Sequence, residues 1–221
     1  MGAQRIRDLL FGFWRARIHR APGIHRNGVI NMKKVLWVDT ETTDLDPIRG
    51  GIIQIAGIIE IDGEAVEEFN FNIAPFPGDI ISPKALEVNK HTTTEISAYP
   101  APLQQKAALE TVLSKYRDKF DKNGEKFFLG GKNVRFDLDF IASWFNKCGD
   151  KYLGSWINWR TLDPQPIVYI ANYQGKLDLP NFKLTTLCEH FGVKLEAAHD
   201  ALADIRATRE LFNIAVKEYL K

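Results

Sequence analysis

Five residues in this sequence have the types and spacing to carry out chemistry together. Asp39 and Glu41 occur in the segment VDTET, Asp137 in NVRFD, and His199 and Asp204 in HDALAD. Four carboxylates gathered in one cleft repel one another, so bound cations are needed to neutralise their charge. Because the ligands are all oxygen atoms, they indicate Mg²⁺ or Mn²⁺ rather than Zn²⁺.

The spacing of these residues predicts how their side chains are placed. Asp39 and Glu41 are two positions apart at the end of an apolar strand, so both side chains project from the same face. His199 and Asp204 are five positions apart, which is about 140° around a regular helix, so they do not share a helical face. We therefore expect Asp204 on a helix facing the cleft, His199 on the loop before it, and Asp200 as the helix cap or in the first turn.

Each motif by itself has a simpler interpretation. An Asp-x-Glu pair after an apolar strand is often a solvated strand end. Asp137 would be unremarkable as a helix cap after Gly130-Gly131, and His199 as a surface loop residue. Three such motifs in this order favour a functional site over three coincidences.

The order, spacing and flanking residues of the motifs resemble the DEDD superfamily of 3′-5′ exonucleases, in its histidine-containing branch (DEDDh). Ribonuclease T, oligoribonuclease and the proofreading exonucleases of bacterial DNA polymerases belong to this branch. The resemblance includes N-x-x-F-D around Asp137 and H-x-A-x-x-D followed by Ala207-Thr208. It also includes the segment Lys84 to Thr92, although we leave His91 out of the site. Residues 33–220 are covered.

The resemblance implies a ribonuclease H-like fold and catalysis with two metal ions, Mg²⁺ or Mn²⁺. It implies that Asp39 bridges the ions, that Glu41 and Asp204 complete one coordination sphere, and that Asp137 holds the other ion. His199 is then the general base, since an imidazole with a pKa of about 6.5 accepts a proton from water at neutral pH. The implied products are nucleoside 5′-monophosphates.

The resemblance further implies a set of residues that contact the terminal nucleotide. These are Thr40, Thr42, Leu45, Asn133 and Phe136. For the two threonines and the leucine, a hydroxyl-bonded turn beside a core leucine is an equally good interpretation. The sequence departs from the family at Asp44, where glycine is common. Glycine would permit a positive φ, which aspartate tolerates better than most residues, so this exchange concerns the shape of the loop.

Composition and charge indicate one domain preceded by a basic leader. The chain has 221 residues, of which 45% are hydrophobic, enough for one substantial core. Residues 1–31 hold six arginines and one acidic residue, a local charge of +5, so the net charge of +1 leaves −4 for residues 32–221. A slightly acidic body favours a protein that binds a few nucleotides at a strand end over a tight binder of duplexes.

The leader and the cysteines bear on location. Apolar residues of the leader form a helical stripe opposed by arginines; they are Ile6, Leu9, Leu10, Phe13 and Trp14. This pattern is typical of membrane-surface, partner-binding or targeting helices, whereas a disordered tail or an upstream start codon before Met32 are the alternatives. No apolar run is long enough for a membrane span, and two distant cysteines indicate no disulfide framework. We expect a cytoplasmic protein.

The hydrophobic pattern of residues 32–221 predicts an α/β domain with a mixed sheet. Strands are expected over residues 34–39, 51–61 and 66–73, and Asp62-Gly63 indicates a hairpin, so these strands should form an antiparallel meander. Later segments alternate between strands and helices. Strands are expected at 127–129 and 156–161, and helices from Ser82-Pro83 and at 103–120, 137–145, 183–191 and 200–219.

Three functions are compatible with these features. The first is a 3′-5′ exonuclease acting on single-stranded DNA, either free-standing or as the proofreading partner of a DNA polymerase. The second is an RNA-trimming enzyme with the same chemistry. The two are hard to separate by sequence, because a protein distinguishes RNA from DNA through contacts of its pocket with the 2′-OH. The third is a nucleic-acid-binding or polymerase-binding module without catalysis, against which the retention of all five residues argues. With no polymerase-length extension, we expect a stand-alone enzyme or a small subunit.

Overall fold

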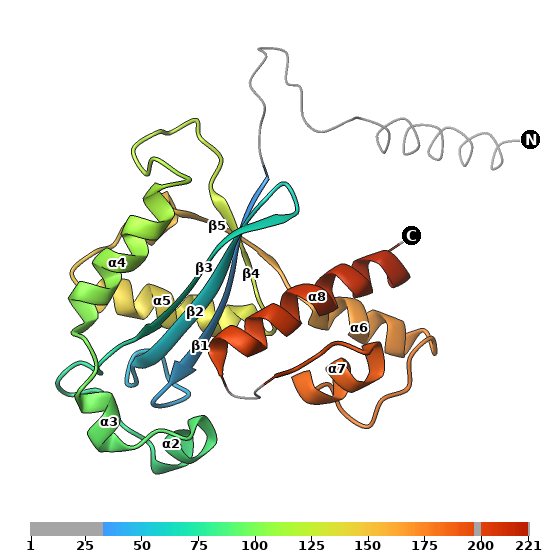
Figure 1. Cartoon of the computed structure of the whole chain (residues 1–221), viewed down its shortest axis with the longest axis horizontal. Helices are drawn as coiled ribbons and strands as arrows, with labels where there is room; N and C mark the ends of the chain where they lie inside the picture. The colour runs from blue at the N-terminus through green and yellow to red at the C-terminus, as the bar shows by residue number, and fades with distance from the viewer. Residues whose placement is uncertain (1–32, 197–199, 221) are drawn as a thin grey trace, which may run out of the picture. The chain divides into compact units, whose positions relative to one another are not determined.

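The fold is built on one five-stranded mixed sheet, and the computed structural model describes residues 33–196 and 200–220. Its strands are β1 (Lys34–Thr42), β2 (Ile52–Ile61), β3 (Glu64–Asn72), β4 (Phe127–Gly130) and β5 (Ile157–Leu162). They lie in the order β3-β2-β1-β4-β5 (Figure 1). β1, β2 and β3 are antiparallel, and β4 and β5 are parallel to β1, which confirms the expected meander and mixed sheet.

Helices cover both faces of this sheet (Figure 1). The helices on one face are α4 (Pro102–Ser114) and α5 (Val134–Lys147). Those on the other side are α6 (Pro164–Tyr173), α7 (Leu184–Phe191) and α8 (Ala201–Tyr219). Two short helices, α2 (Pro83–Asn89) and α3 (Thr93–Ser97), follow β3, and a single 3₁₀ turn, Leu153–Ser155, precedes β5.

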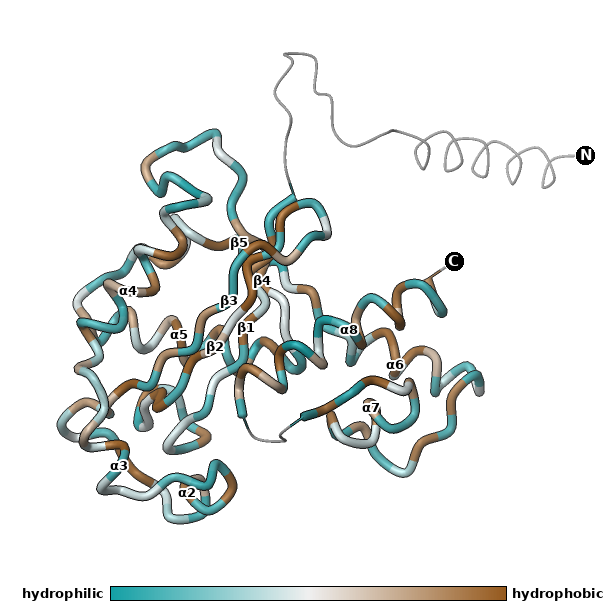
Figure 2. Tube along the Cα trace, in the orientation of Figure 1, coloured by the Kyte–Doolittle hydropathy of each residue, from teal (hydrophilic) through white to brown (hydrophobic). Residues whose placement is uncertain are grey.

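The central strand β1 supplies apolar side chains to both layers. Leu36 and Val38 belong to the apolar cluster formed with α4 and α5, whereas Val35 and Trp37 pack with Ile205 of α8. This division follows from the alternation of side chains along a strand. Figure 2 shows the strands at the centre of the sheet as largely hydrophobic, as expected for strands buried on both faces.

Close packing between the sheet and α8 depends on a glycine. Trp37 lies over Gly130 of the neighbouring strand, and a Cβ atom at Gly130 would be only 2.5 Å from Cε3 of Trp37. On its other side Trp37 meets the edge of the Phe212 ring, with the ring centroids 5.2 Å apart. Trp37 therefore fills the layer between the sheet and α8.

Three element boundaries differ from those expected in ways that affect the site. β1 continues to Thr42, so Asp39 lies within the strand rather than at its last position, and Glu41 lies in the strand rather than after it. α5 begins at Val134, which puts Asp137 in its first turn. The helix expected over residues 103–120 ends at Ser114, and the guanidinium of Arg117 binds the carbonyls of nearby loop residues instead.

Helices α3 and α6 were not predicted. α6 begins after Asp163, whose side chain accepts a hydrogen bond from the backbone N–H of Gln165 at 2.8 Å, and Pro164 occupies the first turn. Both are standard helix-start signals, so this helix was detectable. The expected leader, residues 1–31, lies outside the described residues. No helix in the described part of the chain is both long enough and apolar enough to cross a membrane.

Candidate active site

The acidic residues of β1 and α8 meet at one place. One carboxylate oxygen each from Asp39, Glu41 and Asp204 lie within 4.8 Å of one another. Asp200 is the N-cap of α8, and its side chain accepts a hydrogen bond from the N–H of Ala203 at 2.9 Å, so Asp204 lies in the first turn. The predictions for the shared face of Asp39 and Glu41 and for the position of Asp204 are thus confirmed.

Asp137 reaches the same end of β1 from the opposite face of the sheet. Thr40 lies between the two acidic residues of the strand and projects toward α5. Its backbone N–H and its hydroxyl both donate to Oδ1 of Asp137, at 3.0 Å and 2.7 Å. Asp137 is 4% exposed. These two hydrogen bonds fix its carboxylate directly to the strand that carries Asp39 and Glu41.

The electrostatics of the cluster favour bound cations. Burial, and then the charges of Asp137, Glu41 and Asp204, raise the pKa of Asp39 well above its usual value. Burial and the charges of Asp204 and Asp137 raise the pKa of Glu41 to about 8. Burial raises the pKa of Asp137 to about 7, although the hydrogen bonds from Thr40 oppose this. Grouped oxygens that resist ionisation on their own form a suitable site for hard divalent cations.

Helix α8 is fixed to the sheet by polar contacts near the site. Nε of Arg209 donates to Oε2 of Glu60 at 2.6 Å, and the same oxygen accepts from Nε1 of Trp37 at 3.0 Å. One turn earlier, Nε of Arg206 donates to Oε1 of Glu68 at 3.0 Å. These contacts join α8 to β1, β2 and β3, and so they help to set the position of Asp204.

A cleft of about 390 Å³ opens beside the acidic cluster. It is lined by Thr40, Glu41, Thr42, Asp44, Leu45, Ser82, Lys84, Ala85, Val88, Asn89 and Phe136. Four of the five residues expected to bind the nucleotide are therefore at the cleft. The fifth, Asn133, is the N-cap of α5 and is not among the lining residues. Leu45 is 84% exposed, so its interpretation as a core leucine is wrong.

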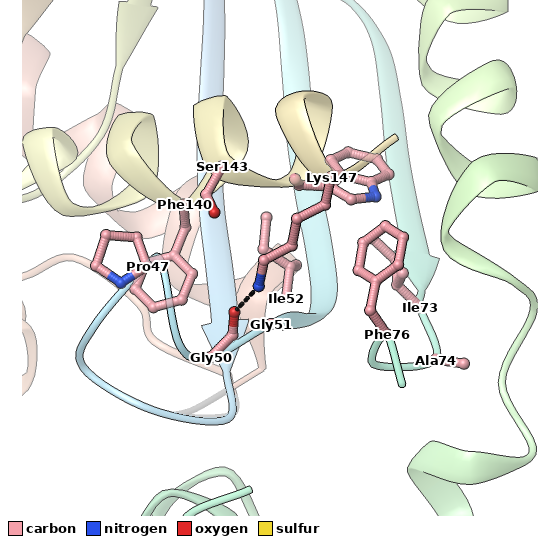
Figure 3. A pocket seen from close by; sticks show the side chains of 11 residues that line it. Pro47, Gly50, Gly51, Ile52, Ile73, Ala74, Phe76, Phe140, Ser143 and Lys147 are labelled. Carbon is pink, nitrogen blue, oxygen red and sulfur yellow. Dashed lines mark hydrogen bonds between the residues drawn. The ribbon is translucent and has the colours of Figure 1, made fainter. Parts of the chain in front are cut away.

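The loop between β1 and β2 forms one border of the cleft. Oδ1 of Asp44 accepts a hydrogen bond from the N–H of Asp46 at 2.9 Å, which stabilises the turn. Asp44 does not adopt a positive φ, so the loop does not require glycine at this position. The loop also contacts α5, because Nζ of Lys147 donates to the carbonyl of Gly50 at 2.6 Å (Figure 3). The loop that presents Leu45 is therefore anchored to α5.

The opposite border of the cleft was missed in the assignment of site residues from the sequence. Helix α2 lines it, and the side-chain amide of Asn89 donates to the carbonyl of Thr42 at 2.9 Å. Lys90, the C-cap of α2, adopts a left-handed conformation with φ 59°. The segment resembled the family, but none of its residues belongs to an acidic motif of the kind formed by Asp39 and Glu41. Its contribution is apparent only from the contact between α2 and β1.

His199 and the two residues before it lie outside the described residues. The next residue, Asp200, is the N-cap of α8. His199 is thus adjacent in sequence to the helix that carries Asp204, and its role as general base stays a prediction.

The sequence and the fold were compared with known proteins. The model of the exonuclease family, of RNase T type, matches residues 36–212. A ribonuclease T from Wigglesworthia glossinidia brevipalpis is 28% identical over 196 residues, covering 83% of this chain and 85% of that protein. A DNA polymerase III of PolC type from Caldanaerobacter subterraneus is 29% identical over 174 residues, covering 79% of this chain but only 11% of the polymerase.

Solved structures agree in fold. E. coli exonuclease I in complex with single-stranded DNA superposes with a TM-score of 0.68 and 20% identity over 86% of this chain. An exonuclease I from Methylocaldum szegediense gives a TM-score of 0.69 at 18% identity. In both cases the match spans 41% of the exonuclease I chain. The family match and the acidic cluster together show that this chain belongs to the DEDDh branch of the 3′-5′ exonucleases, a divalent-metal-dependent family.

Proposed function

We propose that this chain removes nucleotides one at a time from the 3′ end of single-stranded DNA and releases nucleoside 5′-monophosphates. The proposal depends on one observation, the position of the acidic cluster at the edge of the 390 Å³ cleft. This volume lies near the lower end of the range of about 300–1,000 Å³ that is typical of small-ligand pockets. Such a cleft suits a single terminal nucleotide rather than a duplex.

Each acidic residue has a proposed role at the scissile phosphate. Asp39, Glu41, Asp137 and Asp204 would hold two ions, Mg²⁺ or Mn²⁺. Ions bound there supply positive charge to the phosphate and to the leaving 3′ oxygen. His199 would accept the proton of the attacking water, for which an imidazole titrating near neutral pH is suited.

The residues of the cleft would position the terminal nucleotide. Leu45 and Phe136 offer apolar surface to the base, and Leu45 is exposed and free to contact it. Thr42 presents its hydroxyl at the same cleft, although that group also donates to the carbonyl of Asp44 at 2.9 Å. Thr40 acts through Asp137, to which its hydroxyl is hydrogen-bonded. Asn133 is retained as a proposed contact from the start of α5.

RNA is the second candidate substrate. It is favoured by the ribonuclease T relative, which matches this chain over 85% of its own length. The polymerase relatives are matched over a small part of theirs, about a tenth, so association with a polymerase is a further proposal.

Digestion of 5′-labelled single strands tests these proposals. DNA and RNA of the same sequence are incubated with the protein in Mg²⁺, Mn²⁺ or EDTA, together with a circular single strand and a 3′-phosphorylated strand. We expect a ladder that shortens by one nucleotide at a time on DNA, resistance of the circular and blocked strands, and no reaction in EDTA. Faster shortening of RNA would favour the second candidate. No shortening of either strand would indicate a binding module without catalysis.

A further inference from the structure

Lys132 is a cation beside the acidic cluster that has no role in the site as described above. It lies in the turn between β4 and α5. In the parallel pairing of β1 with β4, Trp37 is opposite Gly130. Asp39 and Lys132 each follow two residues later, so Lys132, just past the end of β4, lies near the level of Asp39 in β1. On the far side, the N–H of Gly131 donates to the carbonyl of Leu162 at 3.0 Å, which brings β5 and Asp163 to this level as well.

Within the described part of the chain, every other half-buried or buried lysine has an acidic residue or a backbone carbonyl as its partner, whereas Lys132 has neither. Nζ of Lys106 lies 2.9 Å from Glu110 and 2.8 Å from Asp150, and Nζ of Lys147 lies 2.5 Å from Asp79. Within residues 33–196 and 200–220, Lys132 forms no ion pair and no side-chain hydrogen bond. An ammonium group taken partly out of water without a partner is costly, so its placement needs another explanation.

The surrounding charges supply that explanation in part. Burial lowers the pKa of Lys132, and the charges of Asp163, Asp39, Asp204 and Asp137 oppose the shift. The carboxylate of Asp163 already accepts hydrogen bonds from backbone N–H groups at the starts of α5 and α6. The ammonium is therefore held by the field of several acidic residues without being bonded to any one of them.

Charge balance indicates what the free ammonium would contact. If two divalent ions neutralise the four carboxylates, a phosphodiester entering the cluster brings one negative charge that those ions leave unmatched. The charge on a phosphoryl group grows as the attacking oxygen approaches, and lysine is a common point-charge partner of phosphate. Lys132, a cation near the level of Asp39, is then placed to balance it.

We propose that the ammonium group of Lys132 contacts a non-bridging oxygen of the scissile phosphate and stabilises the charge that develops there. The inference rests on the proposed function and extends it by one residue. The competing explanation is that Lys132 only offsets repulsion among the acidic residues before ions bind. The two explanations predict different effects on turnover.

The test compares wild type with Lys132→Met, Lys132→Arg and Lys122→Met. Lys122 is an exposed lysine on the loop after α4 and serves as the matched control. At saturating Mg²⁺ we expect Lys132→Met to lower kcat by about 10²-fold with little change in KM, as for the loss of one group that stabilises developing charge. Lys132→Arg should recover much of the loss because it keeps the charge, and Lys122→Met should match wild type.

A second measurement reads the contact without turnover. Deoxyadenosine 5′-monophosphate in Mg²⁺ should raise the Tm of wild type and of Lys122→Met, and raise that of Lys132→Met less. Wild-type kcat and an unchanged nucleotide shift in Lys132→Met would overturn the proposal and leave Lys132 as an internal counter-charge. If wild type itself releases no nucleotide, the proposed function fails, and the nucleotide shift alone then decides whether Lys132 binds phosphate.

Discussion

The two acidic residues that come from helices are positioned by differently built halves of the molecule. Asp137 lies on α5, whose apolar residues belong to one continuous cluster with the sheet and α4. Asp204 lies on α8, where most apolar residues pack against α6 and α7 instead. Ile205 of α8 is buried in a small cluster with apolar residues of the sheet, against which two partly buried residues of α8, Leu202 and Phe212, also pack.

This difference shows that one site can be held by two kinds of interaction. On the α5 face, the core and the two hydrogen bonds from Thr40 fix Asp137 to β1. On the α8 face, Arg206 and Arg209 bind Glu68 and Glu60 and supplement a smaller apolar contact. The α5 half should therefore be less sensitive to salt than the α8 half. The α8 half should respond to changes in a few polar side chains, because charge-assisted contacts weaken when either partner is lost.

The largest effect is expected where the two halves meet. Asp39→Asn and Asp204→Asn should each abolish nuclease activity, because each removes a proposed metal ligand. In EDTA both variants should be as stable as wild type or more stable, since repulsion among the buried carboxylates is relieved. Activity is followed on a labelled strand and stability by thermal unfolding. Asp178→Asn, at an exposed position, is the control. Retained activity in either site variant would contradict the assignment of the cluster.

The next largest effect concerns His199, at the start of the α8 half. Loss of a general base costs about 10²–10⁴ in rate. His199→Ala should lower kcat by this amount, leave Mg²⁺ affinity measured by calorimetry nearly unchanged, and remove the acid limb of the pH–rate profile between about pH 6 and 8. His190→Ala, on the exposed side of α7, should behave as wild type. A variant of His199 with normal turnover and the same acid limb would show that another group is the base.

A third prediction compares an arginine from each half. Arg209→Ala removes a partly buried contact to Glu60 and should lower the free energy of unfolding by about 1–3 kcal/mol, with a decrease in kcat as Asp204 loses its alignment. Arg135→Ala on α5 breaks only an exposed ion pair with Asp139 and should cost less than about 0.5 kcal/mol. Urea unfolding measures both. Equal effects of the two substitutions would mean that α8 does not depend on its polar contacts.

The smallest expected effect is the pH dependence of stability without metal. The pKa of Glu41 is raised to about 8 and that of Asp137 to about 7, whereas the same groups in the unfolded chain lose their protons near pH 4. Between these limits the folded state binds more protons than the unfolded state, so raising the pH destabilises it. In EDTA, Tm should therefore fall between about pH 5 and pH 8, and saturating Mg²⁺ should suppress the fall.

Glu41→Gln provides the check on this assignment. Removing one of the carboxyls with a raised pKa should flatten the decrease of Tm with pH in EDTA. The folded state of the variant binds fewer protons in excess of the unfolded state, so unfolding releases fewer protons. A wild-type Tm that rises steadily from pH 5 to pH 8 in EDTA would contradict the raised pKa values. The same variant in Mg²⁺ should show little nuclease activity.

Much of the site was predictable because its residues lie at marked positions of regular elements. The period of two along a strand was enough to put Asp39 and Glu41 on one face, and the helix start at Asp200 was enough to place Asp204 in a first turn. The strand meander followed from alternation and from Asp62-Gly63. The start of α6 carried the same kind of local signal, but it was overlooked.

Contacts between distant segments could not be predicted in this way. The hydrogen bonds from Thr40 to Asp137 join residues 97 positions apart, and the bond from Asn89 to Thr42 joins α2 to β1. No local pattern encodes these pairings, because they depend on where two elements come together. The exposure of Leu45 and the position of Lys132 beside Asp39 are of the same kind.

The sequence by itself indicated the candidate residues of the site and on which side of each element they lie, because local periodicity depends only on neighbouring residues. The tertiary structure decided how those elements meet. It placed Asp137 against β1 through Thr40, anchored α8 through Arg209 and Glu60, and opened the cleft between α2 and the loop that bears Leu45. These features arise from packing between segments far apart in the chain, where burial raises carboxyl pKa values and the site becomes able to bind cations.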